Sequence, residues 1–265
     1  MSLRTRWRPS DRFLVRHKDS ALLVVEKKAG LLTTPRPSER GADLMTLLEF
    51  FVGGGRGRQL VFCVHRLDRP VSGLLVVART AYADKLLQAQ FAEHSVERRY
   101  IAGVSGILAE DEGTFESQLR STDRTLRMRS GNEGRWAVTH WRVIERYPGS
   151  DATLVEVELE TGLRNQIRVH FAEAGHPLLG ERKYLDESDP DASSSQGTGR
   201  LFLHAASLGF THPLTGERLH FDAPLPPDLV TWRKRLASGA NARPGPRPRP
   251  RPRHRHRDKR RAGRR

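Results

Sequence analysis

The sequence is organised around residues 65–78, which read His65-Arg66-Leu67-Asp68-Arg69-Pro70-Val71-Ser72-Gly73-Leu74-Leu75-Val76-Val77-Ala78. An apolar run at residues 60–64 leads into this stretch, and a second run at residues 74–78 ends it. Short apolar runs rich in β-branched residues are typical of buried strands. The charged turn between the two runs carries one carboxylate, that of Asp68, which is therefore expected at the end of a core strand.

Two roles fit Asp68 when it is considered alone. A carboxylate at a strand end commonly forms an ion pair with a neighbouring arginine, here Arg66 or Arg69, and such a pair is structural or solvated. The other role is that of a reactive group. The turn by itself favours the structural role, so the choice depends on partners elsewhere in the chain.

Hydrophobic patterning along the chain predicts a domain of the α+β class. Apolar runs and period-two alternation predict further strands at 13–16, 22–27, 97–104, 136–144, 152–160 and 201–210. Helical spacing predicts helices at 43–51, 81–93, 165–174 and 225–236. Strands outnumber helices and do not alternate regularly with them, which favours a large mixed, mainly antiparallel β-sheet flanked by helices and loops. The segments 103–135 and 186–200 are predicted to be loops that carry recognition surfaces.

Charge is distributed unevenly along the 265 residues. The chain has a net charge of +15, and +11 of this lies between Arg243 and Arg265, which leaves +4 for the rest. In this region Pro alternates with Arg, and a segment without large apolar side chains cannot offset its ordering entropy by burial. We therefore expect a loose lead-in at residues 1–12, one folded domain at 13–237, and a disordered Arg/Pro-rich basic tail at 238–265.

Several classes of protein are disfavoured by what the sequence lacks. It has a single cysteine, Cys63, so a disulfide framework is not expected, which fits a reducing cytosol. No apolar stretch has the length of a membrane span, and the N-terminus lacks the pattern of a signal peptide. Phosphate-loop, dinucleotide-binding and HExxH motifs are also absent from the sequence. These features predict a cytoplasmic protein with no membrane association, no nucleotide cofactor and no metal.

A second group of chemically capable residues lies at 161–170, Thr161-Gly162-Leu163-Arg164-Asn165-Gln166-Ile167-Arg168-Val169-His170. Gly162 permits a sharp turn, and a helix beginning near Asn165 would place free backbone N–H groups beside Arg164 and Arg168. The two arginines are four residues apart and are predicted to share one helix face. Such a site suits a carboxylate or a phosphate, although a solvated basic face is an equally good interpretation.

Three ring-bearing residues need a role as well. Tyr100 follows two arginines in a predicted strand, where it is either a core aromatic with its hydroxyl at the rim or a ring that stacks on a base. His65 and His204 lie at or in core strands, and we expect both to be hydrogen-bonded structural histidines.

The motif His65-Arg66-Leu67-Asp68, followed by Ser72-Gly73-Leu74-Leu75, resembles the central motif of the RluA-type pseudouridine synthases. Four further stretches resemble motifs of this family in the same order, and they are residues 28–31, 99–102, 161–184 and 203–213. The third motif departs from the usual pattern, because Leu163-Arg164-Asn165 replaces Arg-x-His and puts Asn165 at the histidine position.

The resemblance implies the pseudouridine synthase fold, with an active-site cleft across the sheet, in a form lacking the N-terminal S4 domain of many relatives. It implies isomerisation of uridine in rRNA or tRNA to pseudouridine, with RNA as the partner and no cofactor. Nothing in the sequence suggests an obligate protein partner, so we expect a monomer. The uracil is detached from C1′, turned and rejoined through C5, which requires the target nucleotide to leave its stack.

The resemblance also assigns roles to individual residues. Asp68 is the catalytic carboxylate, which either attacks the nucleotide or deprotonates it; Arg168 pairs with Asp68, and Tyr100 stacks against the flipped base. The residues expected to bind substrate are Arg66, Arg164, Asn165, Gln166 and Leu203, the last as an apolar wall. The alternative is a non-catalytic RNA-binding or chaperone protein on the same fold, which would not need the set of Asp68, Tyr100 and Arg168.

Overall fold

The computed structural model describes residues 12–36, 41–54, 57–122, 127–185 and 200–239. The strands in these ranges are β1 (Phe13–Lys18), β2 (Leu22–Lys27), β3 (Phe62–Cys63), β4 (Ser72–Ala78), β5 (Glu97–Ser105), β6 (Glu112–Thr122), β7 (Arg127–Ser130), β8 (Arg135–Tyr147), β9 (Ala152–Leu159), β10 (Leu203–Thr211) and β11 (Arg218–Asp222). The helices are α1 (Leu44–Gly53), α2 (Ala81–Ala92), α3 (Gln166–Glu173) and α4 (Pro227–Ala237), with a short 3-10 turn, η2 (Pro148–Ser150).

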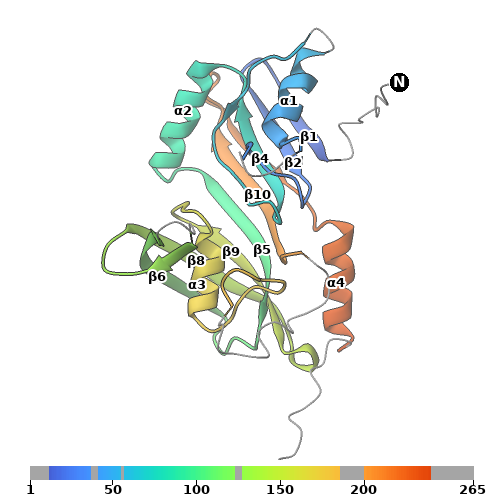
Figure 1. Cartoon of the computed structure of the whole chain (residues 1–265), viewed down its shortest axis with the longest axis vertical. Coiled ribbons are helices and arrows are strands. Elements are labelled where there is room, and N and C mark those ends of the chain that lie inside the picture. Colours follow the sequence, from blue (N-terminus) through green and yellow to red (C-terminus); the bar gives the residue numbers. More distant parts are fainter. Residues whose placement is uncertain (1–11, 37–40, 55–56, 123–126, 186–199, 240–265) are drawn as a thin grey trace, which may run out of the picture.

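All of these strands belong to one sheet with the order β1-β2-β4-β10-β5-β9-β8-β6-β7, while β11 pairs with β10 and β3 pairs with β4. Every pairing is antiparallel except that between β4 and β10. Figure 1 shows an upper half built on β1, β2 and β4 and a lower half built on β6, β8 and β9, joined through β10 and β5. The prediction of a mixed, mainly antiparallel α+β fold is confirmed.

Helices cover both faces of the sheet, which explains the continuous apolar run at 74–78. Leu75 and Val77 belong to the large core that includes residues of α1 and α3, whereas Leu74 and Val76 pack with residues of α2. Successive side chains of a strand point to opposite faces, so a strand that is covered on both sides needs apolar residues at every position. A third core, around Trp232 of α4, covers the sheet in the lower half.

The prediction of a loop at 103–135 is wrong, because this segment contains the end of β5 and all of β6 and β7. Strand β6 reads Glu-Gly-Thr-Phe-Glu-Ser-Gln-Leu-Arg-Ser-Thr, and only Leu119 is fully buried. A strand with one solvent-exposed face and few apolar residues lacks the hydrophobic run that indicates a strand in a sequence.

Other predicted segments fall at the edges of the described ranges. Of the lead-in at 1–12 only residue 12 is described, and of the tail at 238–265 only residues 238 and 239. The predicted loop at 186–200 lies outside the described residues except for residue 200. None of the helices in the described ranges has the length and apolar character needed to cross a membrane.

Gly73 allows the parallel contact between β4 and β10 that joins the two halves. Its φ is +119°, and a Cβ atom at this position would lie 2.2 Å from the carbonyl oxygen of Ala205. Only glycine adopts this backbone without strain and permits this approach. Next to it, the Ser72 hydroxyl hydrogen-bonds Nδ1 of the buried His204 at 2.8 Å, and burial lowers the pKa of this histidine. His204 thus has the structural role that was expected.

Candidate active site

The turn that carries Asp68 is held by the segment that follows β2. The hydroxyl of Thr33 donates to the carbonyl of Leu67 at 2.8 Å, and Gly30 N–H donates to the carbonyl of Arg69 at 2.7 Å. Within the turn, Val71 N–H donates to the carbonyl of Asp68 at 3.0 Å. The backbone on both sides of Asp68 is therefore fixed by partners that are distant in sequence.

The buried ammonium group of Lys27 also holds the turn that carries Asp68. Its Nζ donates to the carbonyls of Leu31 at 2.8 Å, Lys28 at 3.2 Å and Arg69 at 3.4 Å, and the side chain is fully buried. Burial lowers the pKa of Lys27 to about 7, although the nearby Asp68 carboxylate opposes this shift. The buried lysine of this segment is thus Lys27, while Lys28, with which the family resemblance begins, is exposed.

The predicted pairing of Asp68 with Arg168 is present. Arg168 Nη1 donates to Asp68 Oδ2 at 3.1 Å, across a sequence separation of 100 residues. A second carboxylate, Glu181, accepts from the other two guanidinium nitrogens, with Nε–Oε2 and Nη2–Oε1 distances of 2.7 Å. A bidentate pair fixes the plane of an arginine, so Glu181 aims Arg168 at Asp68.

Burial opposes both charges of this pair, but mutual attraction outweighs it. Burial alone would lower the pKa of Arg168, yet Glu181 and then Asp68 raise it above its ordinary value. Burial would raise the pKa of Glu181, yet Arg168 and the backbone N–H groups of Lys183 and Arg182 lower it. Arg168 and Glu181 are therefore expected to be charged at neutral pH.

Asn165 lies between Asp68 and a tyrosine that follows Glu181. Its side-chain Nδ2 donates to Asp68 Oδ2, and its Oδ1 accepts from the Tyr184 hydroxyl at 3.0 Å. Both polar atoms of the Asn165 side chain are therefore engaged by the protein. The structure places it as a partner of Asp68, a contact that the sequence did not indicate.

Gln166 has a different position from the one expected. It is buried, and its amide makes four hydrogen bonds of 2.9 Å, to Thr161 Oγ1, Leu163 N, the Val138 carbonyl and Thr139 Oγ1. Four bonds exhaust the capacity of a glutamine amide. The amide of Gln166 therefore holds the 161–166 turn against β8, while the residue also lines the cleft described below.

Arg164 also differs from its prediction. Helix α3 begins at Gln166, after Asn165 in a left-handed conformation, so Arg164 precedes the helix and does not share a helical face with Arg168. It is half-buried and lines the cleft described below. Burial, together with the charges of Arg164 and Arg168, lowers the pKa of Lys183, which shows that positive charge accumulates at this edge of the site.

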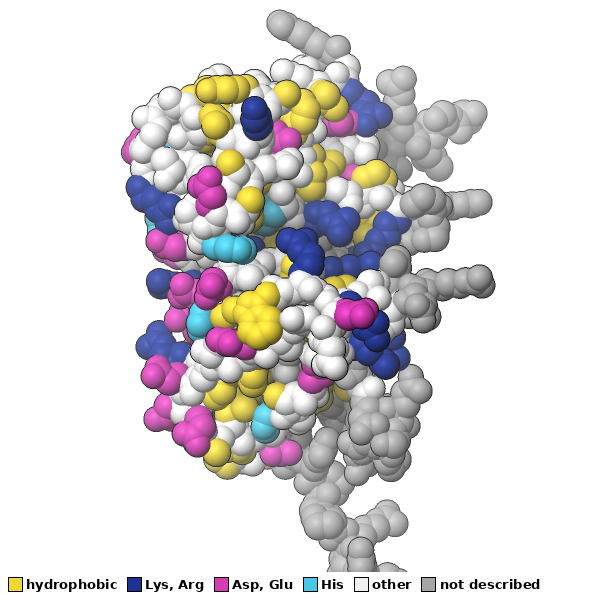
Figure 2. Space-filling view, turned by 90° about the vertical axis from the view of Figure 1, so that its left-hand side faces the viewer, with side chains coloured by type: hydrophobic (Ala, Val, Ile, Leu, Met, Phe, Trp, Pro, Cys, Tyr) yellow, Lys and Arg dark blue, Asp and Glu magenta, His cyan; other side chains and the backbone are white. Residues whose placement is uncertain are grey.

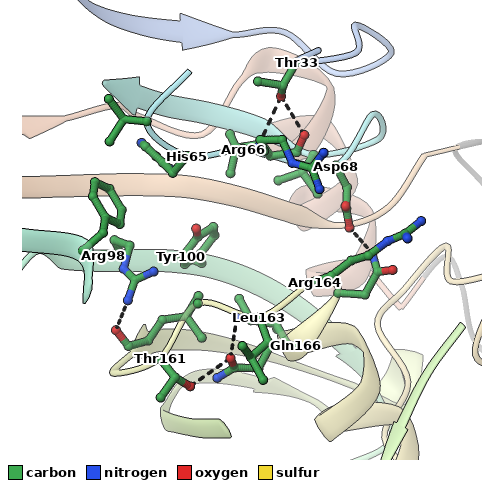
Figure 3. A pocket seen from close by; sticks show the side chains of 18 of the residues that line it. Thr33, His65, Arg66, Asp68, Arg98, Tyr100, Thr161, Leu163, Arg164 and Gln166 are labelled. Carbon is green, nitrogen blue, oxygen red and sulfur yellow. Dashed lines mark hydrogen bonds between the residues drawn. The ribbon is translucent and has the colours of Figure 1, made fainter. Parts of the chain in front are cut away.

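Tyr100 and Leu203 come from the two strands that join the halves. Tyr100 is on β5 and Leu203 is on β10. Tyr100 is 7% exposed, Leu203 is 4% exposed, and both line the cleft. Burial raises the pKa of Tyr100, although the neighbouring Arg98 opposes this, so the hydroxyl stays protonated at neutral pH. In Figure 3 Asp68 and Tyr100 lie around the same space, with Arg98 at its other end.

His65 and Arg98 close the end of the cleft away from Asp68. His65 Nε2 accepts from Val76 N–H at 3.1 Å, and its ring stacks on Phe91 with centroids 4.6 Å apart. Burial, followed by the charge of Arg98, lowers the pKa of His65 to about 3, so this ring is neutral and structural, as expected. Arg98 itself donates to the carbonyls of Leu159 and Glu160.

A cleft of about 1080 Å³ lies between the two halves, and Asp68, Asn165 and Arg168 line it together with Tyr100 and Leu203. Its lining is rich in arginine, with Arg36, Arg66, Arg69, Arg98, Arg135, Arg164 and Arg168, against two carboxylates, Asp68 and Glu160. Figure 2 shows Lys and Arg side chains gathered around the hollow between the halves. The cleft also contains Trp136, whose side chain is 53% exposed. A basic cleft with an exposed aromatic ring suits single-stranded nucleic acid.

Four residues of this site were missed at the level of sequence: Lys27, Trp136, Glu181 and Tyr184 as a hydrogen-bonding partner. Glu181 and Tyr184 belong to the segment after Gly180 that resembles the third family motif. The spacing Glu181-x-x-Tyr184 was a usable signal, because a carboxylate and a phenol three residues apart after a glycine turn can meet the same arginine. For Trp136 and Lys27 the sequence offered no signal beyond residue type.

The model of the RNA pseudouridylate synthase family matches residues 21–173. The chain belongs to this family. It is 38% identical over 218 residues to the uncharacterized RNA pseudouridine synthase YlyB of Bacillus subtilis, covering 81% of this chain and 69% of that protein. It is 39% identical over 229 residues to the ribosomal large subunit pseudouridine synthase D of Zymomonas mobilis, covering 83% and 71%. The chain is thus an isomerase that acts on RNA.

Solved structures support the same fold. The human RNA pseudouridylate synthase domain containing 4 superposes with a TM-score of 0.66 at 23% identity, covering 84% of this chain and 92% of that one. The human RNA pseudouridylate synthase domain containing 1 gives a TM-score of 0.64 at 25% identity, covering 82% and 86%.

Proposed function

We propose that this synthase isomerises a uridine of ribosomal RNA and that Asp68 is the carboxylate that acts on it. The observation that carries the assignment is the Asp68–Arg168–Glu181 arrangement, in which a bidentate ion pair aims Arg168 at Asp68 inside a basic cleft. A protein that only bound RNA would not need a carboxylate fixed in a cleft that must attract phosphates. Ribosomal RNA is favoured over tRNA because the Zymomonas relative is named for the large ribosomal subunit.

The reaction needs no atom that the RNA does not supply. The N1–C1′ bond breaks, a C1′–C5 bond forms, C5 loses a proton and N1 gains one, so atoms and electrons balance. Asp68 serves either as the nucleophile or as the base that starts this exchange. Arg168 orients the carboxylate, and the neutral Tyr100 ring, with Leu203, forms the walls against which the flipped uracil packs.

The rest of the cleft binds the RNA around the target nucleotide. Arg66 and Arg164 lie on its lining beside Asp68 and are positioned for phosphates of the flanking nucleotides. The exposed ring of Trp136 offers a face on which an unstacked base can pack. We further propose that the enzyme works as a monomer in the cytoplasm.

Replacement of Asp68 by Asn tests the assignment directly, because it keeps the shape of the side chain and removes the charge. Wild-type and Asp68→Asn proteins are incubated with RNA from a strain that lacks the gene, and pseudouridine is mapped chemically along rRNA and tRNA. We expect the wild type to modify defined rRNA positions and Asp68→Asn to lose at least about 1000-fold in rate. Asp222→Asn, at the exposed end of β11, is the matched control and retains activity.

Two results contradict the proposal. Equal modification by wild type and Asp68→Asn removes Asp68 from the chemistry. Modification restricted to tRNA positions leaves the role of Asp68 standing but shows that the substrate is tRNA and not rRNA.

A further inference from the structure

Hydrogen bonds around Asp68 converge on one of its two oxygens. Oδ2 accepts from Arg168 Nη1 at 3.1 Å and also from Asn165 Nδ2. Within the described part of the chain, no hydrogen bond reaches Oδ1. Since each carboxylate oxygen has two lone pairs, Oδ2 is saturated by these two donors and Oδ1 keeps both of its own for the substrate.

The orientation of the Asn165 amide follows from its partners. Met128 N–H donates to the Tyr184 hydroxyl oxygen at 3.2 Å, so the tyrosine uses its own proton toward Asn165 Oδ1 at 3.0 Å. An aspartate carboxylate oxygen only accepts, so the Asn165 atom that faces Asp68 Oδ2 is the nitrogen, which leaves Oδ1 to accept from Tyr184. The Nδ2 end of the amide therefore points at Asp68 and can only donate to it.

The backbone of Asn165 supports a role for this side chain outside the helix. Its φ is +55°, a left-handed conformation that asparagine tolerates better than most residues. It immediately precedes α3, where an asparagine commonly caps the helix with its side chain. Here no such capping bond forms, because the side chain is turned to Asp68 and Tyr184.

Both donors to Asp68 Oδ2 are fixed by one short segment, residues 181–184. Glu181 holds Arg168 through two bonds of 2.7 Å, and Tyr184 holds Asn165 through its hydroxyl. The Tyr184 ring also lies 5.3 Å from the Arg168 guanidinium, at a distance typical of a cation–π contact. Asp68 is thus oriented by two parallel supports, of which only Arg168 was expected.

We propose that Asn165 is a positioning residue which, held by Tyr184, orients Asp68 so that Oδ1 is the oxygen that acts on the uridine. This proposal rests on the role of Asp68 argued under "Proposed function". The proposal gives a role to Asn165, which occupies the position in the third motif where RluA-type synthases usually have histidine. A histidine ring can supply one N–H donor at the same place, so the two residue types are chemically related solutions.

Replacement of Asn165 by Asp separates positioning from a merely structural role. Aspartate tolerates the left-handed backbone and is a good helix N-cap, so a structural role predicts a nearly normal kcat. Positioning predicts the largest loss, because a second carboxylate repels Asp68 instead of donating to it. We expect kcat to fall at least about 100-fold in Asn165→Asp and about 10- to 100-fold in Asn165→Ala, with KM for rRNA changed less than about threefold.

Two further variants complete the test. Tyr184→Phe keeps the ring over Arg168 and removes the hydroxyl, and we expect kcat to fall about tenfold. Its matched control is Tyr147→Phe, because the Tyr147 hydroxyl also has two partners, Glu145 at 2.6 Å and Arg233 at 3.2 Å, outside the cleft. Asn165→His restores a donor, so its kcat should exceed that of Asn165→Ala.

The outcomes distinguish this proposal from the one on which it rests. If Asp68→Asn is inactive while Asn165→Asp and Tyr184→Phe keep wild-type kcat, positioning by Asn165 is overturned and the role of Asp68 stands. If Asp68→Asn is active, both are overturned. Circular dichroism and denaturation confirm that each variant is folded; should Asn165→Asp fail to fold, the comparison of Tyr184→Phe with Tyr147→Phe decides the matter.

Discussion

Lys27 is an ammonium group that the fold buries next to Asp68, the proposed catalytic carboxylate. The ammonium group has three carbonyl partners, one of them Arg69 in the turn after Asp68. Loss of the ammonium group would remove a donor from the carbonyls of Leu31 and Lys28, whereas the Arg69 carbonyl would keep its bond from Gly30 N–H. Lys27 therefore holds the turn that carries Asp68 against β2. Its protonation state is linked to the free energy of unfolding.

The low pKa of Lys27 predicts a stability that rises with pH. The pKa is 10.5 in the unfolded chain and about 7 in the folded protein, so between these values the unfolded state binds more protons. Below pH 7 both states are protonated and the cost of burial is fully present; the free energy of unfolding then increases as the pH rises. From pH 7 to about pH 9.5 this contribution amounts to roughly 3 kcal/mol.

Urea denaturation of wild type and Lys27→Met across this range measures the effect. The wild-type free energy of unfolding should rise more steeply with pH than that of Lys27→Met, since methionine cannot titrate. Lys28→Met, at the exposed neighbouring position, is the control and should follow the wild type. Parallel pH dependences in wild type and Lys27→Met would rule out a buried titrating lysine.

At the scale of elements, the contact between β4 and β10 connects the two halves next to the active site. It is the parallel pairing of the sheet, with Ala205 opposite Gly73 and His204 opposite Ser72. Gly73 lies only five residues after Asp68, so any displacement of β4 moves the turn that carries Asp68. Tight packing at this position therefore supports both stability and the geometry of the site.

Gly73→Ala is expected to be far more costly than a glycine substitution in open space. The new methyl group would meet the Ala205 carbonyl at 2.2 Å in a backbone with φ of +119°, so both strain and a clash oppose it. We expect a loss of about 3 kcal/mol or more in the free energy of unfolding, together with reduced activity. Gly175→Ala, with φ of +81° and no atom within 4 Å, carries strain alone and should cost about 1 kcal/mol. Equal costs in thermal or urea denaturation would show that the close approach is unimportant.

How far the sequence predicted these elements depends on how each is buried. Strands β2 and β4 are apolar because both faces are covered, and the sequence therefore indicated them clearly. The wet strand β6 has no comparable run and was mistaken for a loop. The pairing of Asp68 with Arg168 came from the resemblance, whereas the support by Tyr184 depends on how the 181–184 segment docks on α3. Docking of this kind is a tertiary property that no local pattern encodes.

At the scale of the whole molecule, Asp68 lies in a cleft between the two halves of the sheet, and arginine side chains surround it. Seven arginines line the cleft, although the part of the chain before Arg243 carries a net charge of only +4. Positive charge is therefore concentrated where RNA must bind rather than spread over the surface. Counterion release from the phosphates should make RNA binding by the cleft alone dependent on salt.

The sequence after residue 239 adds a second, larger source of charge. Arg243–Arg265 carries +11 of the net +15 and contains none of the cleft residues. Each phosphate neutralised by a cation contributes about 0.7 to 0.9 to the slope of log affinity against log salt. We expect removal of residues 240–265 to weaken binding of an rRNA fragment and to flatten this slope by several units, while kcat at saturating RNA stays within about twofold because Asp68 and its supports are intact.

Fluorescence anisotropy of a labelled rRNA fragment over a series of salt concentrations measures both slopes, and single-turnover assays at saturating enzyme measure the chemistry. A full-length variant in which the eleven arginines of 243–265 are replaced by glutamine separates charge from length. If charge is responsible, this variant behaves like the truncated protein. An unchanged salt slope after truncation would confine RNA binding to the cleft, whereas a lost kcat would mean that the C-terminal segment takes part in placing the uridine before Asp68.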